Sequence, residues 1–510
     1  MGSRTNVFTT LVILCVIASF SADSSTVDVT RSDFPADFVF GVTTDAPQYE
    51  GATDVARKGP SVWDNYIKKF PERIQDHSNL SIATDSYRQY KEDVVAMKNL
   101  GVDANRFSIA WTRILPNGSL NGGINQEGLD HYNNVIDELL KNGIQPFVTL
   151  LHFDPPQALT DKYGGVLSRS FVADFKDYCE LCFKTYGDRV KNWITINEPL
   201  IMAKLGYDFG VGPPARCSVP VKEHAPPCTG GNSGTEPYTV SHNLLLAHAT
   251  VVNLYRDKFL GDQGGQIGIS LVGQYVEPFS NSIEDKAAAK RLMDFEIGWY
   301  MEPLVYGAYP KIMRLLAKQR IPTFTVEEKK LMKGSFDFIG VNYYTSRFGR
   351  YLPRKPGAPI AYRSDTFARA VTENKDRVLI GPKVRKAQGI DFIYSYPQGL
   401  QKLLEFMNQN YQSPTVYITE NGITEAKLDK SLKDPHRIQY ILQHLYRIKM
   451  AMKNGVNVKG YFHWSLLDNF EFRQGFVPKF GLYYVDRNNN LTRIPKESAK
   501  WLPKFLNDNA

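Results

Sequence analysis

Two glutamates occupy positions in the sequence that suit acid-base and nucleophilic chemistry. Glu198 follows a β-forming run at 192–197, and Glu420 ends a second such run at 415–420. Two carboxyl groups on either side of one bond can hydrolyse a glycoside, because one protonates the leaving oxygen while the other attacks the sugar or activates water. The spacing alone also allows a simpler interpretation, in which both glutamates form structural ion pairs.

Other familiar kinds of active site have no matching motif. The chain has no P-loop and no HExxH, and its nine histidines show no spacing typical of metal ligands. We therefore expect a metal-independent glycosidase that needs no cofactor.

The elements that would position these glutamates can be read from the apolar pattern. Segments of helical periodicity separate short β-forming runs, and those at 84–101 and 127–143 each end in a glycine suited to a helix C-cap. Alternation of this kind predicts an α/β fold, a single (β/α)8 TIM barrel with long βα loops. The strand runs are 38–44, 104–111, 145–152, 192–197, 266–274, 336–343, 415–420 and 458–464, and the long loops are 205–236, 347–390 and 421–435.

In such a barrel the C-terminal ends of the strands meet at one rim, where chemistry takes place. Glu198 and Glu420, on the fourth and seventh strands, would therefore face each other across one pocket. Other polar and aromatic residues fall at the same strand ends, and they gain weight only as a group: Gln48, Arg106, His152, Asn197, Asn342, Tyr344, Trp464 and Glu471.

Three long motifs carry a resemblance to a known family. WITINEP (193–199), YITENG (417–422) and HWSLLDNFEFRQGF (463–476) resemble the signatures of glycoside hydrolase family 1, the beta-glucosidases of plants in particular. The resemblance runs from about residue 34 to 506. It implies a TIM barrel over 23–510 and a beta-glucosidase that retains the anomeric configuration, with Glu198 as the acid/base and Glu420 as the nucleophile.

The resemblance also implies roles for the surrounding residues. Arg106 would lie beside Glu420 and favour its ionised form, and Tyr344 would hydrogen-bond the same carboxylate. The negative charge of Glu420 would raise the pKa of Glu198, which must be protonated to act as an acid. The sugar would be bound by Gln48, His152, Asn197, Asn342, Tyr344, Trp464, Glu471, Phe472 and Phe480.

Several positions depart from the usual family pattern. The segment that usually resembles SAYQ is Asp45-Ala46-Pro47-Gln48, and phenylalanine replaces the usual tryptophan at Phe153, Phe392 and Phe472. The change at Phe472 removes an indole N–H that typical members direct at the sugar. We therefore expect altered glucose recognition and a reshaped aglycone site, with Phe392 and Lys204 as candidate aglycone residues.

Three alternatives to an ordinary beta-glucosidase remain open. Phenylalanine at 392 and 472 also occurs in myrosinases, so the chain could be a thioglucosidase in which Lys204 meets the sulfate of a glucosinolate, although a solvated or salt-bridged Lys204 is the favoured interpretation. A bound alcohol could intercept the glycosyl-enzyme, which would make the chain an acyl-glucose-dependent glucosyltransferase. A degenerate barrel that binds without catalysis is the non-enzyme alternative.

The N-terminus predicts a secreted protein. Arg4, an apolar run at 7–20 and small residues before Asp23 are typical of a cleavable signal peptide over residues 1–22, and the destination would be the vacuole, the apoplast or the ER lumen. In that setting Cys217 and Cys228 would form a disulfide, whereas Cys179 and Cys182 are expected to be packed core thiols. N-glycosylation sequons stand at Asn79, Asn117 and Asn490.

The charge and hydropathy of the chain bear on whether it binds nucleic acid or spans a membrane. The chain has 61 Lys+Arg and 53 Asp+Glu, a net charge of +8, but the basic residues form no long run. We expect no nucleic-acid partner and no membrane-spanning segment in the mature protein. The expected partner is a small-molecule glucoside, and homo-oligomerisation is left open.

Overall fold

The computed structural model describes residues 28–220, 227–354, 356–383, 392–424 and 432–507. The predicted signal peptide lies outside these residues, as do parts of the three predicted loops. None of the described helices is both long and apolar enough to cross a bilayer.

Eight parallel strands close into a barrel in the described residues, in the order β1-β11-β10-β7-β5-β4-β3-β2. This confirms the predicted fold class, and each predicted run overlaps one barrel strand. The barrel strands are β1 Val39–Thr43, β2 Ala104–Ser108, β3 Gln145–Leu151, β4 Asn192–Asn197, β5 Gln266–Val272, β7 Phe338–Asn342, β10 Val416–Asn421 and β11 Val458–His463.

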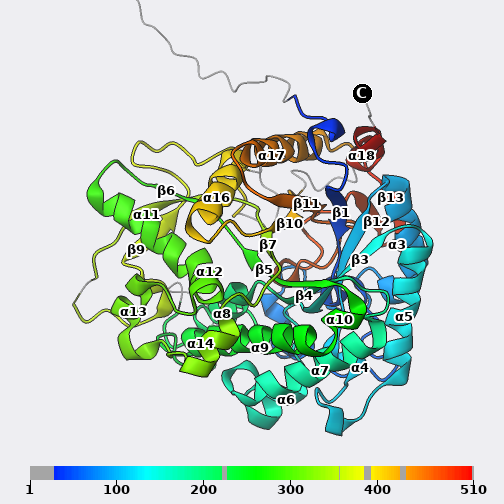
Figure 1. Cartoon of the computed structure of the whole chain (residues 1–510), viewed down its shortest axis with the longest axis horizontal. Coiled ribbons are helices and arrows are strands. Elements are labelled where there is room, and N and C mark those ends of the chain that lie inside the picture. Colours follow the sequence, from blue (N-terminus) through cyan, green and yellow to red (C-terminus); the bar gives the residue numbers. More distant parts are fainter. Residues whose placement is uncertain (1–27, 221–226, 355, 384–391, 425–431, 508–510) are drawn as a thin grey trace, which may run out of the picture.

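Long helices surround the strands and cover the outer face of the barrel (Figure 1). The two segments predicted to be helical by periodicity are α3 and α5, and the glycine after α3, Gly101, has the positive φ expected of a C-cap. The long helices are α3 Ser86–Leu100, α5 Gln126–Lys141, α7 Ser170–Tyr186, α9 Glu236–Lys258, α11 Ile283–Phe295, α12 Ile297–Tyr306, α16 Pro397–Asn410, α17 Pro435–Lys453 and α18 Glu497–Asn507.

Short helices and strands lie in the segments between the barrel strands and the long helices. The short helices are α1 Ala46–Tyr49, α2 Val62–Lys69, α4 Trp111–Ile114, α6 Gln157–Tyr163, α8 Pro199–Tyr207, α10 Leu260–Gln263, α13 Lys311–Ala317, α14 Val326–Met332 and α15 Tyr362–Asp365. The remaining strands are β6 Val276–Pro278, β8 Arg347–Tyr351, β9 Ala368–Val371, β12 Tyr483–Asp486 and β13 Thr492–Pro495.

The long βα loop predicted at 347–390 contains secondary structure that the sequence pattern did not indicate. Its described part contains β8, α15 and β9, and β6, β8 and β9 form a small sheet that packs beside α11, away from the barrel (Figure 1). The run RFGRY of β8 is short and partly exposed, so its sequence has no strong strand pattern. Pairing with β6 and β9 and packing on α11 make it a strand.

Aromatic rings fill the barrel below its carboxyl-terminal rim. Phe147 lies 4.9 Å from Phe462 and 5.4 Å from Tyr417, measured between ring centroids, and Phe338 lies 5.1 Å from Tyr417. All four side chains are buried. Gly41 on β1 makes room for this packing, because a Cβ there would come within 2.4 Å of the ring of Phe462. The barrel interior is therefore a packed core beneath the site.

The cysteines lie as the sequence predicts. Cys217 and Cys228 form a disulfide, and Cys179 and Cys182 are free thiols buried on α7. The sequon residues Asn79, Asn117 and Asn490 are exposed, which glycosylation requires, although the modification itself stays a prediction.

Candidate active site

Glu198 lies where β4 ends and α8 begins. Its backbone has φ 43° and ψ 61°, a left-handed conformation that is uncommon for a residue with a side chain, and its N–H donates to the carbonyl of Ser270 on β5 (2.8 Å). Pro199 occupies the first helical position after it, where its fixed φ suits a helix start. The junction therefore holds the carboxyl group at the rim by backbone constraints.

Glu420 lies near the end of β10, and two donors hold its carboxylate. Arg106 on β2 donates from Nη1 to Oε1 (2.5 Å), and the Tyr344 hydroxyl donates to Oε2 (2.6 Å). Burial and the neighbouring carboxylate raise the pKa of Tyr344 well above its ordinary value, so the phenol keeps its proton. Both donors were expected from the sequence, and the structure brings both to Glu420.

Hydrogen bonds connect the two glutamates through amide side chains. Asn197 Oδ1 accepts from Arg106 Nη2 (2.6 Å) and from Asn342 Nδ2 (3.0 Å), and Asn342 Nδ2 also donates to Glu198 Oε1 (2.7 Å). Thr419 donates to Asn342 Oδ1 (2.7 Å), which orients that amide. Sequence reasoning did not single out Thr419, because a strand threonine has no distinguishing pattern. Every member of this network is buried.

The surroundings push Glu198 toward its neutral form. Burial raises the pKa of Glu198 to about 8, and the charge of Glu420 adds to the effect, whereas Asn342 and Arg106 oppose it. The charge of Glu420, which was expected from the sequence, is the smaller cause, and removal of Glu198 from water is the larger one. At neutral pH Glu198 can thus donate a proton while its partner is bonded to a guanidinium.

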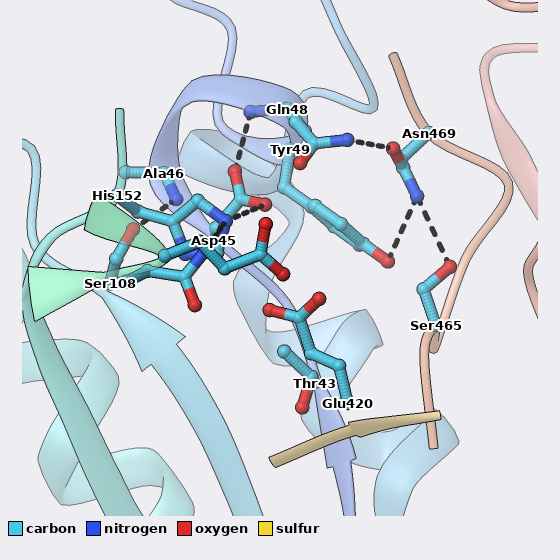
Figure 2. Close-up of polar contacts among 12 residues, drawn as sticks. Thr43, Asp45, Ala46, Gln48, Tyr49, Ser108, His152, Glu420, Ser465 and Asn469 are labelled. Carbon is cyan, nitrogen blue, oxygen red and sulfur yellow. Dashed lines mark hydrogen bonds and ion pairs between the residues drawn. The ribbon is translucent and has the colours of Figure 1, made fainter. Parts of the chain in front are cut away.

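The predicted sugar-binding residues collect beside Glu420. Gln48 Nε2 donates to Asn469 Oδ1 (2.8 Å; Figure 2). The same nitrogen donates to the carbonyl of Phe470 (2.8 Å) and lies 3.5 Å from Glu471 Oε2. Asn469 was missed as a site residue, although it belongs to the motif at 463–476. Burial raises the pKa of Glu471 to about 8, and its Oε1 has no hydrogen-bonding partner among the described residues.

Three ring systems form part of the same site. The rings of His152 and Trp464 lie 6.4 Å apart at an angle of 18°, and Trp464 is 3% exposed. Phe480 packs edge-on against Tyr344 at 6.1 Å. These contacts place His152, Trp464 and Phe480 next to the residues that hold the two glutamates, as the sequence predicts.

Two of the phenylalanine departures are one packing unit. Phe472 lies 4.6 Å from Trp63 on α2 and 5.6 Å from Phe153, between ring centroids. Phe153 and Phe472 both have positive φ, 69° and 50°. The two phenylalanines that replace tryptophan are therefore not independent: together with Trp63 they form one apolar wall.

The candidate aglycone residues, Lys204 and Phe392, have other partners. Lys204 on α8 forms an ion pair with Glu296 (3.0 Å), and Gln274 donates to the other oxygen of Glu296 (2.6 Å). This is the salt-bridged lysine that the sequence also allowed. Phe392 is 47% exposed, and its backbone carbonyl accepts from Arg347 (2.5 Å).

No group of three or more His, Cys, Asp or Glu in the described parts of the chain is arranged to hold a metal ion. The carboxyl groups of Glu198 and Glu420 can supply proton transfer and nucleophilic attack.

Comparisons with known proteins agree with this geometry. The glycosyl hydrolase family 1 model matches residues 30–510. Beta-glucosidase 12 of Oryza sativa subsp. indica is 49% identical over 503 residues, which cover 98% of this chain and 97% of that protein. The furostanol glycoside 26-O-beta-glucosidase of Hellenia speciosa is 50% identical over 492 residues, or 96% and 86% of the two chains.

Solved structures show the same fold. The rice Os3BGlu6 beta-glucosidase superposes with a TM-score of 0.90 at 43% identity, covering 94% of this chain and 100% of that one. A mutant of the same rice enzyme has been solved in a covalent complex with glucose. The matched fold, the full-length relatives and the paired glutamates lead to one conclusion: the chain belongs to glycosyl hydrolase family 1.

Proposed function

We propose that this chain hydrolyses beta-glucosides of a hydrophobic plant-type aglycone by double displacement, with Glu420 as the nucleophile and Glu198 as the acid/base. The contrast between the two carboxyl groups carries the proposal. Glu420 accepts hydrogen bonds from Arg106 and Tyr344, whereas burial raises the pKa of Glu198 to about 8. Retaining hydrolysis needs one group of each kind.

In the first step Glu420 attacks the anomeric carbon and Glu198 protonates the leaving oxygen. The bond from carbon to the aglycone breaks, and a covalent glucosyl-enzyme forms. Esterification removes the negative charge of Glu420, which contributes to the raised pKa of Glu198. Glu198 can then accept a proton from water, which attacks from the opposite face and releases beta-glucose.

The amide network supports the transition state of both steps. Asn197 is fixed by its bonds to Arg106 and Asn342, and by family resemblance it would bind the sugar 2-hydroxyl. A contact that strengthens as positive charge develops on the ring lowers the barrier rather than KM alone. The two hydrogen bonds to Oδ1 hold the Asn197 amide in one orientation before the sugar binds.

The aglycone is proposed to be apolar. Phe392 presents an exposed aromatic ring, and Phe153, Phe472 and Trp63 form an apolar wall. One relative is named for a furostanol glycoside, which is compatible with a large aglycone. The thioglucosidase alternative has less support, because Lys204 is bonded to Glu296. The intact network argues against a barrel without catalysis.

Product analysis tests the proposal. Purified enzyme would be incubated with apolar O-glucosides, a glucosinolate and an alcohol acceptor, and the first-formed sugar anomer would be followed by proton NMR. We expect beta-glucose from the O-glucosides, with little turnover of the glucosinolate. Alpha-glucose as the first product would exclude double displacement. Glucosinolate as the best substrate would favour a thioglucosidase, and a dominant alkyl glucoside would favour a transferase.

We also propose entry into the secretory pathway. The support is the apolar N-terminal run, the disulfide and three exposed sequons. Mass spectrometry of the protein from plant tissue should find a mature N-terminus near Asp23 and glycans on Asn79, Asn117 or Asn490. An unprocessed, unglycosylated chain would contradict it.

A further inference from the structure

The positive charge of the chain is concentrated in the segment that builds the small sheet. The whole chain has a net charge of +8, and residues 347–383 alone contain nine Lys or Arg but only three Asp or Glu. One of these acids, Asp365, is buried and paired with Arg320 (2.5 Å). The segment includes β8 and β9, and β9 lies beside α11 at the edge of the molecule (Figure 1).

Two arginines lie directly opposite each other in this sheet. Arg350 on β8 is the register partner of Arg369 on β9 in an antiparallel ladder. Their side chains therefore leave the same face of the sheet, with Cβ atoms about 5 Å apart. Both residues are exposed, and neither forms an ion pair with a described residue. Like charges in this arrangement destabilise a sheet.

The face that carries these arginines points into solvent. Side chains alternate along a strand, and position 349 faces α11, because a Cβ on Gly349 would lie 2.6 Å from Cα of Ala289. Arg350 therefore points to the opposite side, where its guanidinium lies 5.0 Å from the centre of the Phe279 ring. The N–H of Lys375 donates to the carbonyl of Phe279 (3.0 Å), so the backbone of another exposed basic residue is held there.

We call the exposed side chains of Arg350, Arg369 and Lys375 the basic face. Nearby carboxylates do not neutralise it. Asp285 on α11 is within electrostatic range of Arg350, but its oxygens accept the N–H of Tyr351 (2.8 Å) and the hydroxyl of Ser280. The basic face therefore keeps positive charge that the described part of the chain does not compensate.

Protection of a sheet edge explains only part of this arrangement. Charged side chains on an edge strand prevent pairing with other chains, which would account for Arg369 on the edge strand β9. It does not account for Arg350, because β8 is the central strand in the order β6-β8-β9. A repulsive pair that costs stability and protects nothing indicates a surface that an anion covers.

We infer that the basic face binds an acidic polysaccharide, with carboxylates of the polymer bridging Arg350 and Arg369. Arginine binds a carboxylate with two parallel hydrogen bonds, and a bridging carboxylate replaces the repulsion by two attractions. An exposed sheet face suits an extended polymer, whereas small molecules bind in concave sites. No residue of the sugar site belongs to the basic face, so this binding is separate from hydrolysis.

The choice of polymer rests on the proposed secretory route. A protein in the secretory lumen or outside the cell does not meet the anionic lipids of the cytoplasmic leaflet. Carboxylated polysaccharides are polyanions of the extracellular matrix. The basic face would thus hold the enzyme on an acidic matrix while its active site processes small glucosides.

Co-sedimentation of the full-length enzyme with polygalacturonate tests the inference. The fully methyl-esterified polymer is the control, because it has the same backbone without the charges. We expect the wild type to bind the acid form at low salt, to be released at high salt and to ignore the ester.

Three variants locate the binding. R350Q/R369Q should bind about 5–30-fold more weakly, the effect of two exposed charge-assisted contacts. R369E should weaken binding at least as much and raise Tm, because an attractive pair replaces the repulsive one. K98Q/K141Q removes the same charge from exposed positions on α3 and α5, on the other side of the barrel (Figure 1), and should bind like the wild type. All three should keep wild-type glucosidase activity.

Equal weakening in K98Q/K141Q and R350Q/R369Q would overturn the inference, since net charge alone would then drive binding. Equal binding of the methyl ester, or tighter binding of phosphatidylserine vesicles or DNA, would exclude the acidic polysaccharide as the partner. A lower Tm in R369E would remove the repulsion on which the inference rests. Failure of the secretory proposal is seen separately, as an unprocessed chain, and failure of the glucosidase proposal as a wild type that releases no glucose.

Discussion

The floor of the site and its outer wall are built in different ways. On the floor, Arg106, Asn197, Asn342 and Glu420 come from four barrel strands and are joined by direct hydrogen bonds of 2.5–3.0 Å. The wall comes from loops and short helices, and packing between rings holds it, as in the contact of Phe472 with Trp63. Reaction chemistry is thus fixed by the regular backbone, whereas selectivity depends on loops that can change independently.

The largest effect is expected on the floor, from E420Q. Without the carboxylate no glycosyl-enzyme can form, so turnover of every substrate should fall on the order of 10⁶-fold, as when other covalent nucleophiles are removed. Steady-state assays with good and poor leaving groups measure it, and E327Q, at an exposed position of α14, is a folded control. Residual activity that depends on the leaving group would contradict the nucleophile assignment.

The second prediction concerns E198A, which should act selectively. General acid-base catalysis is worth about 10²–10⁴-fold, so poor leaving groups should lose that much while dinitrophenyl glucoside still glycosylates the enzyme and gives a burst. Azide needs no base and should rescue the second step with beta-glucosyl azide as product.

Two outcomes of that experiment would be decisive against the assignment. Equal loss on good and poor leaving groups would remove Glu198 as the acid. An alpha-configured azide product would exclude double displacement.

The third prediction is a dependence on pH. Burial raises the pKa values of Glu198 and Glu471 to about 8, so kcat/KM for a poor leaving group should fall as the pH rises through about 8. Both carboxyls bind a proton more tightly in the folded chain. The stability they contribute is complete below about pH 4.5 and is lost as the pH rises through about 8.

Chemical denaturation at pH 5 and pH 9 measures the stability effect. E198Q cannot ionise, so it should lose less free energy of unfolding than the wild type between these pH values, by on the order of 3 kcal/mol. An identical loss in both proteins would show that Glu198 is not the group that titrates.

The fourth prediction concerns the wall. F472W restores an indole N–H. If the ring fits beside Phe153 and Trp63, KM for simple glucosides should fall by the equivalent of one hydrogen bond, roughly 0.5–1.5 kcal/mol of binding free energy. Because Phe153 and Phe472 are in contact, the changes F153L and F472W should not be additive in a double-mutant cycle. If F472W raises KM both in the wild-type chain and in F153L, with an intact fold, the wall has been rebuilt around phenylalanine.

The smallest effect is expected at Lys204. Because Lys204 is bonded to Glu296, K204M should change kcat/KM for O-glucosides and for a glucosinolate by the same factor, below about 3-fold. E296Q is the matched variant, since it releases the lysine and should favour anionic aglycones. A selective loss on the glucosinolate in K204M would restore the sulfate-binding role.

Prediction from sequence succeeded for the positions of residues at the strand ends. The β-run periodicity located Glu198 and Glu420 at one rim, and family resemblance named the donors to Glu420. It failed where tertiary contacts determine the structure or the pKa. The strand β8 depends on pairing with β6 and β9. Burial raises the pKa of Glu198 more than the charge of Glu420 does, and burial cannot be read from the sequence. The approach of Asp45 Oδ2 to within 3.4 Å of His152 Nε2 could not be foreseen, because it joins residues far apart in the chain.

The aromatic packing beneath the rim has a kinetic consequence. Phe147, Phe338, Tyr417 and Phe462 close the barrel interior, so the sugar enters, reacts and leaves through the same mouth that holds the aglycone. The first product must depart before water reaches the glucosyl-enzyme, and glucose leaves last. We therefore expect ping-pong kinetics in which free glucose competes with incoming substrate, while the released aglycone binds a different enzyme form.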